Sequence, residues 1–344
     1  MPRVLHIVVT DSFGGVERYV SEVASGFADD SWQPTVVGGN ERAMRAALRE
    51  GVRWLPGRNP LEALASVRRA GRQDICHAHM TYAEAVGIAA RRAHSAPIVS
   101  TRHFAAHRGK TRVGRFTAPW IARNLSCEIA ISRFVADHVE RPPDCVIVNG
   151  VPDSPALWNR ENRVVLVAQR LEPEKDTLTA LRAWQQSGLA DQGWSLRVVG
   201  DGSQRRELED QARSHGGDRV AFAGWVGDMR SEFEQAGMLL APAPSEPFGL
   251  TVVEALAAGV PVVAAAAGGH LETVGELPSA RLFRPGDADD AAAAMGALLA
   301  DDAREAMSVE GRQLVRIRFR LDAHVELLCA QYAVVQSSSR NGRR

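Results

Sequence analysis

Cysteine is scarce in this sequence, and its few cysteines form no recognisable pattern. A disulfide framework or a zinc site needs cysteines in pairs at short, regular spacing, and no C-x-x-C pair occurs. A disulfide-stapled secreted domain and a zinc module are therefore disfavoured, and a reducing, cytoplasmic environment fits best. The four cysteines are Cys76, Cys127, Cys145 and Cys329.

Long uncharged hydrophobic runs are also missing. A membrane-spanning helix needs about 18 consecutive apolar residues. The longest run of small apolar residues, around Ala255 to Ala267, is interrupted by Gly259 and Pro261. The apolar run from Arg3 to Thr10 is too short for a signal-peptide core and fits a buried strand. We therefore expect neither a membrane span nor secretion.

The chain has no excess charge of either sign, with 41 basic and 41 acidic residues, so it has no general bias toward nucleic acid. Residues 102–127 are the local exception, because they carry six basic residues and no acid, interleaved with aromatic residues. Such a stretch can dock on an anionic acceptor or on anionic lipid, peripherally at the inner face of the cell membrane. The alternative is a solvated helix whose apolar face joins the core. The basic residues are Arg102, Arg108, Lys110, Arg112, Arg115 and Arg123.

Short runs rich in Val, Ile and Leu alternate with helical patterns in both halves of the chain. This alternation predicts an α/β protein with two doubly wound parallel sheets, each covered by helices on both faces. We place the first domain at residues 1–150, a Gly- and Pro-rich linker at 151–162, and the second domain at 163–320. Residues 337–344 have too little apolar content to fold and are predicted to be disordered.

The densest motif runs from Ser245 to Val263, where a loop leads into a helix and then into a strand. Glu246 precedes the predicted helix and Glu254 lies about two turns into it, so they can reach opposite ends of one elongated ligand. Between them, the backbone amides of Phe248, Gly249 and Leu250 open a helix N-terminus, which favours a phosphate.

This stretch resembles the E-x7-E signature of the retaining glycosyltransferases of family 4, also called glycosyl transferases group 1. The resemblance implies that Glu246 holds hydroxyls of the donor sugar and that Glu254 holds the ribose. Taken alone, two glutamates on an ordinary helix surface would be the simpler interpretation. Other parts of the family pattern, however, occur in order along the chain.

After the strand at Val164 to Ala168, the sequence resembles the family's G-R-L-x-x-x-K-G, with Arg170 and Lys175 at the positions that bind the donor diphosphate. Fixed cations there would stabilise the charge that builds on the leaving diphosphate, without a metal. Gln169 and Asp176 stand where the family commonly has glycine, which alters the loop between them.

Further matches are weaker individually. Gly200 belongs to a V-G-x-G turn, and Val226 lies in the segment that holds the nucleobase in the family. Gly14 and Gly15 match the G-G-x-E loop that approaches the donor phosphate. His103 ends a T-x-H string and would face the reacting sugar.

His77 and His79 alternate on a strand and therefore share a face, but no third metal ligand occurs at a recognisable spacing. We expect no metal and no cofactor, the nucleotide sugar being a co-substrate. NAD is disfavoured, because Arg205 occupies the third-glycine position of a dinucleotide fingerprint.

The resemblance spans nearly the whole chain and implies the GT-B architecture, two Rossmann-like domains facing across a cleft. The last helix, at 321–336, would return to the first domain. The expected activity is retaining transfer of a sugar from a nucleotide sugar to an unidentified acceptor, such as a glycolipid, a saccharide or a natural product. High Ala and Arg usage suggests a bacterial source, with envelope glycoconjugate or secondary-metabolite biosynthesis as settings. The alternatives are a sugar-nucleotide epimerase of the same fold and a non-catalytic nucleotide-binding module.

Overall fold

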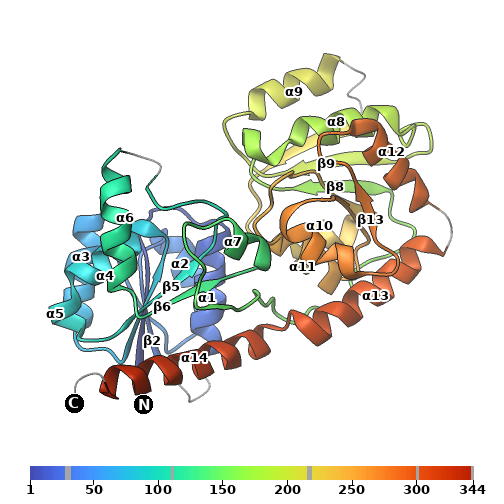
Figure 1. The fold of residues 1–344 in the computed structure, drawn as a ribbon. Coiled ribbons are helices and arrows are strands. Elements are labelled where there is room, and N and C mark those ends of the chain that lie inside the picture. The colour runs from blue at the N-terminus through green and yellow to red at the C-terminus, as the bar shows by residue number, and fades with distance from the viewer. Residues whose placement is uncertain (28–31, 110–111, 215–218, 300–301, 342–344) are drawn as a thin grey trace. The chain divides into compact units, whose positions relative to one another are not determined.

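A computed structural model describes residues 1–27, 32–109, 112–214, 219–299 and 302–341 (Figure 1). The chain folds as two compact units, Met1–Pro152 with Leu321–Arg344, and Asp153–Arg320. Part of the predicted linker lies inside the second unit, where the Leu157 amide donates to the Ala258 carbonyl (2.9 Å) and the Trp158 indole donates to the Gly237 carbonyl (3.1 Å).

The first unit contains a seven-stranded parallel sheet in the order β3-β2-β1-β4-β5-β6-β7. Its strands read as near-continuous apolar runs because helices cover both faces. In β1, for example, Val4, Leu5, Ile7 and Val8 are all fully buried. The strands are β1 (Arg3–Val8), β2 (Gln33–Val37), β3 (Arg53–Leu55), β4 (Ile75–His79), β5 (Ile98–Arg102), β6 (Cys127–Ala130) and β7 (Cys145–Val146). The helices are α1 (Gly15–Gly26), α2 (Glu41–Ala47), α3 (Pro60–Ala70), α4 (Thr81–Ala89), α5 (Arg91–His94), α6 (Arg112–Asn124) and α7 (Arg133–Asp137).

The last helix, α14 (Leu321–Asn341, red in Figure 1), packs against α1 of this unit. Its buried face supplies Val325, Leu328 and Tyr332 to the core. The helix continues past the end predicted at residue 336, so residues 337–341 are helical and the prediction of disorder there was wrong. Extending a helix that is already anchored by packing costs far less than nucleating a new one. Residues 342–344 lie outside the described residues.

A chain of buried hydrogen bonds joins α14 to the sheet, and it begins at a backbone carbonyl. His324 Nδ1 lies 2.7 Å from the Val148 carbonyl oxygen, which can only accept, so Nδ1 carries the proton. Burial lowers the pKa of His324 to about 4, so its other nitrogen, Nε2, is an acceptor near neutral pH. The hydroxyl of Tyr19 in α1, 2.8 Å away, therefore donates to His324.

The same reasoning fixes the rest of the chain of bonds. The Tyr19 oxygen accepts from the hydroxyl of Thr101 in β5, and Thr101 lies 2.7 Å from His77 Nε2. His77 Nε2 is therefore a donor, which leaves its Nδ1 to accept from the hydroxyl of Tyr332 at 2.6 Å. The chain of bonds thus meets α14 twice, at His324 and at Tyr332, and the two bonds in which a tyrosine donates to a histidine require that histidine to be neutral.

The second unit contains a six-stranded parallel sheet in the order β10-β9-β8-β11-β12-β13. The direction in which strands are added reverses at β8. The strands β9 and β10 follow it on one side, and β11, β12 and β13 follow on the other side. The strands are β8 (Val164–Ala168), β9 (Ser195–Val199), β10 (Val220–Gly224), β11 (Met238–Ala241), β12 (Val262–Ala265) and β13 (Arg281–Phe283). The helices are α8 (Thr177–Gln186), α9 (Arg205–Ser214), α10 (Arg230–Gln235), α11 (Leu250–Ala257), α12 (Ala288–Ala297) and α13 (Ala303–Arg318), with 3-10 turns η1 (Pro173–Lys175), η3 (Gly268–Glu272) and η4 (Val274–Glu276).

All the strands expected from the apolar runs are present, and the two doubly wound parallel sheets confirm the predicted fold class. One strand was missed, β3, because three residues are too few to show a period. Among the described helices, none is long and apolar enough to cross a membrane.

Candidate active site

Lys175 and Glu246, the two central predicted residues, meet in the second unit. Lys175 follows β8 and Glu246 follows the neighbouring strand β11, so both lie where the strand order reverses. Open parallel sheets bind their ligands at such a switch point, outside the carboxyl ends of the strands. Lys175 Nζ lies 2.6 Å from Glu246 Oε2, and the two side chains are 15% and 18% exposed. The result is a largely buried cation and carboxylate that can still be reached from one side.

Arg170, the second predicted phosphate-binding cation, does not join this pair. Its Nη2 lies 2.8 Å from Glu174 Oε1 in an ion pair that is more than half exposed. An exposed pair of this kind is worth little energy, so Arg170 is free to leave Glu174 for a ligand.

The loop between Arg170 and Lys175 explains the two departures from the family pattern. Gln169 Nε2 donates to the Lys175 carbonyl and to the Thr177 hydroxyl, both at 2.9 Å, which fixes the turn that presents Lys175. Asp176 adopts the left-handed conformation at φ 50°, which explains why glycine is common there. Its side chain also caps α8 by accepting from the amide and the hydroxyl of Thr179.

We therefore expect Asp176→Gly and Asp176→Ala to differ in their free energy of unfolding. Glycine loses the cap but relieves the backbone, so its cost should be a few tenths of a kcal/mol, against about 2 kcal/mol for alanine. Urea unfolding of the two variants measures the difference. Equal losses would show that the left-handed backbone at residue 176 is unimportant.

Close packing of the protein itself requires glycine at Gly200, and the left-handed backbone favours it at Gly249. A Cβ on Gly200, which has φ 130°, would lie 1.9 Å from the Gln169 carbonyl oxygen. The turn after β9 is thereby held against the loop that carries Lys175. Gly249 is the N-cap of α11 at φ 92°, and it aims the free amides at the start of this helix.

The remaining predicted donor contacts occupy neighbouring loops of the same sheet edge. Leu250 begins α11, so Glu254 lies about one turn into the helix rather than two. Phe248 is buried, and its ring packs edge-on against Phe319 with centroids 5.7 Å apart. Val226 follows β10 and is half-buried.

His270 was missed by the sequence analysis and lies beside the Lys175–Glu246 pair. It is buried in η3, after β12, and its Nδ1 donates to the Ala265 carbonyl at 3.2 Å. Burial lowers the pKa of His270, while Glu246 raises it, and the imidazole is therefore neutral at neutral pH with Nε2 as an acceptor. The G-G-H string at 268–270 was the available signal.

In the first unit, Gly14 and Gly15 begin α1 after strand β1. Gly14 is the N-cap, and its amide donates to the carboxylate of Glu17 at 2.7 Å. A Cβ on Gly15 would meet nothing within 4 Å, so the fold itself does not require glycine there. The open space beside Gly15 is consistent with the predicted approach of a ligand.

His103 lies at the end of β5 but is buried in a cluster of histidines. Its Nε2 lies 3.0 Å from His79 Nδ1, and His79 Nε2 lies 3.1 Å from His6 Nδ1. Burial lowers the pKa of His103 to about 3. His103 also borders a small cavity of about 150 Å³, together with Thr81, Phe104 and others.

The structure supplies the third histidine that sequence spacing did not reveal. His6 pairs in register with His77 on the neighbouring strand, and ligand nitrogens of His6, His77 and His79 lie within 4.8 Å of one another. Both ring nitrogens of His77 and both of His79 are already hydrogen-bonded, so a metal ion would have to replace those bonds. His6 Nε2 is buried without a partner.

The structure describes the side chains of three of the six basic residues in the stretch at 102–127, and two of these are buried in ion pairs. Arg108 is 1% exposed and binds Glu84 with two bonds, of 2.7 and 2.5 Å. Arg102 is 8% exposed and binds Glu128 and Glu140, at 2.9 and 3.0 Å. The charges of Arg102 and Arg108 are thus neutralised by glutamates distant in sequence, and Arg123 remains exposed. The side chains of Lys110, Arg112 and Arg115 lie outside the described residues.

Two Rossmann-like units, the second with a cation and carboxylate at its switch point, define a glycosyltransferase of the GT-B fold. Two family models match consecutive parts of the chain, "Glycosyltransferase Family 4" over residues 13–154 and "Glycosyl transferases group 1" over residues 153–314. The chain belongs to this glycosyltransferase family, which confirms the resemblance seen in its sequence.

Individual relatives agree with this assignment. Glycogen synthase of Mycobacterium tuberculosis H37Rv is 28% identical over 301 residues, 80% of this chain and 71% of that protein. Phosphatidyl-myo-inositol mannosyltransferase of Mycolicibacterium smegmatis is 31% identical over 252 residues, 67% of this chain and 63% of that protein. The solved structure of Anabaena Alr3699/HepE in complex with UDP and glucose superposes with a TM-score of 0.80 at 22% identity, over 97% of this chain and 100% of that one.

Proposed function

We propose that this glycosyltransferase takes its sugar from a nucleoside diphosphate sugar, with UDP as the leaving group, and transfers it with retention of configuration and without a metal. The observation that carries the proposal is the Lys175–Glu246 pair at the switch point of the second sheet. The similarity to a structure solved with UDP and glucose supports the choice of UDP.

The residues of the second unit suit separate parts of such a donor. Lys175 would turn from Glu246 to the diphosphate, joined by Arg170, while Glu246 would accept hydrogen bonds from the sugar hydroxyls. The free amides at the start of α11, near Phe248 to Leu250, favour the same negative charge. Glu254 would bind the ribose hydroxyls.

In the reaction that we propose, the bond from the anomeric carbon to the diphosphate breaks as the acceptor oxygen bonds to the same face. The acceptor proton passes to a diphosphate oxygen, so no protein base is needed. Lys175 and Arg170 then act by stabilising the charge that develops on the leaving group. This stabilisation decreases if either side chain is lost. The acceptor would bind to the first unit, where Gly14, Gly15 and His103 lie.

The first test is a thermal-shift screen with UDP, GDP, ADP and dTDP and their common sugar conjugates, with and without EDTA. A nucleotide at about 100 times its Kd stabilises the protein by about 2.7 kcal/mol, which raises Tm by several degrees. We expect UDP or a UDP sugar to give this shift, and EDTA to leave it unchanged.

Two variants connect the shift to the site. Lys175→Ala should lose most of the shift that UDP itself gives, because UDP carries the full charge of the leaving group, whereas Arg182→Ala, an exposed change on α8, should keep it. Stabilisation by NAD alone would contradict the proposal. Free sugar or an epimerised donor without any acceptor would identify an epimerase, and binding without turnover for every acceptor tried would indicate a non-catalytic module.

A further inference from the structure

Six arginines gather at the edge of the first sheet opposite the edge that carries Gly15 and His103. This edge is formed by the segments that lead into β4, β5 and β6. Backbone hydrogen bonds hold these segments side by side, from the Gln73 amide to the His94 carbonyl (2.9 Å) and from the Ser126 amide to the Ile98 carbonyl (2.7 Å). We call this set the arginine edge, and its members are Arg68, Arg69, Arg72, Arg91, Arg92 and Arg123.

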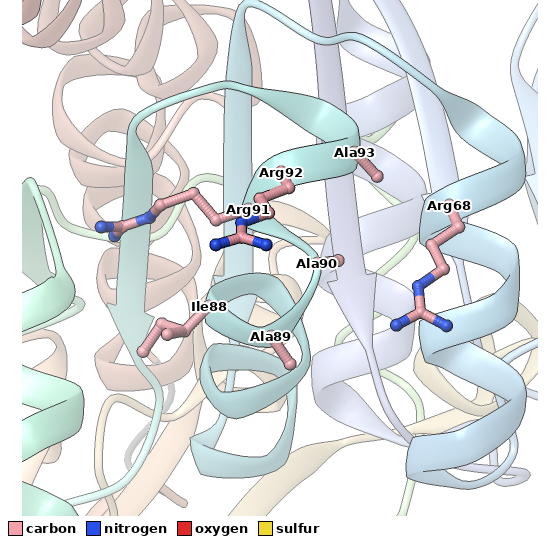
Figure 2. Close-up of a pocket in the computed structure, with 7 residues that line it drawn as sticks. All are labelled: Arg68, Ile88, Ala89, Ala90, Arg91, Arg92 and Ala93. Atoms are coloured by element: carbon pink, nitrogen blue, oxygen red, sulfur yellow. The ribbon is translucent and has the colours of Figure 1, made fainter.

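An open groove of about 740 Å³ lies within the arginine edge. Arg68 from α3 and Arg91 and Arg92 from α5 line it, with the small side chains of Ala89, Ala90 and Ala93 among them (Figure 2). No acidic residue lines the groove. Arg91 is fixed in place, because its guanidinium bonds to the side chain and the carbonyl of Asn124 at the end of α6.

The charge of the arginine edge is not neutralised by the protein. All six arginines are exposed, and none pairs with a carboxylate among the described residues. The one acid in these three segments, Asp74, accepts instead from the Arg3 amide at 2.8 Å. By contrast, exposed arginines elsewhere, such as Arg213 and Arg230, have glutamate or aspartate partners.

Stabilisation of helix ends accounts for only part of this arrangement. Five of the six lie in a last helical turn, where cations interact favourably with the helix dipole; these are Arg68 and Arg69 in α3, Arg91 and Arg92 in α5, and Arg123 in α6. Arg72, however, lies beyond the C-cap Gly71, where the dipole has ended. The dipoles also do not explain why cations from three helix ends lie together without a carboxylate partner among the described residues, which an external anion would explain.

We propose that the arginine edge docks the protein on an anionic phospholipid bilayer. The arginines come from segments before three adjacent strands, spaced about 4.8 Å apart, so they spread along an edge rather than converge on one small anion. Trp120, 52% exposed, lies within a turn of Asn124 on the same margin, and tryptophan favours the membrane interface. Each arginine near such a surface strengthens binding several-fold.

This docking orients the first unit. The strands β4 and β5 have five residues each, so about 17 Å separates the arginine edge from the edge with His103. An acceptor on the same bilayer would have to extend that far, which favours a growing glycan over a bare lipid headgroup. The proposal goes beyond the proposed function and does not depend on the identity of the donor.

The test is sedimentation of the full chain with phosphatidylglycerol-rich vesicles and with pure phosphatidylcholine vesicles, without donor. Wild type should bind only the anionic vesicles, and high salt should release it. The triple variant Arg68→Gln, Arg72→Gln, Arg92→Gln should bind roughly 100-fold more weakly, since three cations are lost. Its turnover of a water-soluble acceptor should remain that of wild type.

The matched control is Arg182→Gln, Arg206→Gln, Arg316→Gln, which removes the same charge from exposed positions of the second unit. It should bind vesicles like wild type. An equal loss in both triple variants, or no vesicle binding by wild type, would overturn the proposal. So would binding to soluble dextran sulfate but not to vesicles, which would identify a polyanion site instead. The comparison of anionic with neutral vesicles uses wild-type protein alone, so it does not depend on the folding of any variant.

Discussion

Replacing Lys175 with alanine is expected to lower kcat by about 100- to 1,000-fold, with a smaller change in KM. The ammonium group stabilises charge that develops mainly as the bond to the diphosphate breaks, so its loss affects the transition state more than the bound donor. The pairing of Lys175 with Glu246 at 2.6 Å keeps the ammonium at the switch point before the donor arrives, from where it would turn to the diphosphate.

Glu246→Ala is expected to abolish measurable transfer while leaving the fold intact. The double variant should be no worse than Glu246→Ala alone, because residues that act as a unit are not additive. Initial rates with the donor found in the thermal-shift screen measure these effects, with Arg182→Ala as the matched control. Undiminished turnover in either single variant would remove the pair from the mechanism.

Chemical labelling gives an independent measure of the same site. Lys110 and Lys175 are the only lysines in the sequence. A lysine-directed reagent followed by mass spectrometry should therefore show Lys175 protected by donor and Lys110 unprotected. Equal labelling of Lys175 with and without donor would contradict the proposed contact.

Acidification from pH 7 to pH 5 is expected to remove much of the stability of the first unit. Burial lowers the pKa of His6 and His103 to about 3 and that of His324 to about 4, and it holds His77 and His79 well below their ordinary range. A histidine with a lowered pKa binds fewer protons when folded than when unfolded, so stability is lost as pH falls below about 6.5.

The size of the effect follows from this linkage. At pH 5, each histidine whose folded pKa lies at or below about 4 reduces the free energy of unfolding by about 2 kcal/mol. Three such residues, His6, His103 and His324, account for about 6 kcal/mol, which is a large part of the 5 to 15 kcal/mol typical of a domain. Protonation would also break the hydrogen-bond chain that holds α14, so unfolding of this helix should accompany the loss.

Calorimetry between pH 7.5 and pH 5 at constant ionic strength measures the effect. We expect one transition to move steeply to lower temperature as the pH falls. His6→Phe should reduce the slope of the free energy of unfolding against pH by about 1.4 kcal/mol per pH unit, which is the contribution of one proton. His138→Gln, at an exposed position of the same unit, should leave the slope unchanged. Transitions that do not move with pH would show that these histidines are not buried as described.

The sequence by itself determined the parallel α/β sheets, because apolar strands alternating with helices pack as a parallel sheet with helices covering it. It also determined where ligands bind, since loops after parallel strands lie at one edge of the sheet. The residues predicted there, from Arg170 to Glu254, do lie after strands of one sheet edge, either on the loops or, for Leu250 and Glu254, in helix α11. Their roles toward the donor stay predictions until the experiments above are done.

Tertiary structure alone decided which side chains meet. Lys175 and Glu246 are 71 residues apart, and no local pattern could pair them. His6 joined His77 through strand register, and His270 reached Glu246 through packing after β12. Arg102 and Arg108 pair with glutamates distant in sequence, while arginines from three separate segments lie together at the opposite edge. Charge and hydrogen bonding act over a few ångströms in space, whereas the sequence records only distance along the chain.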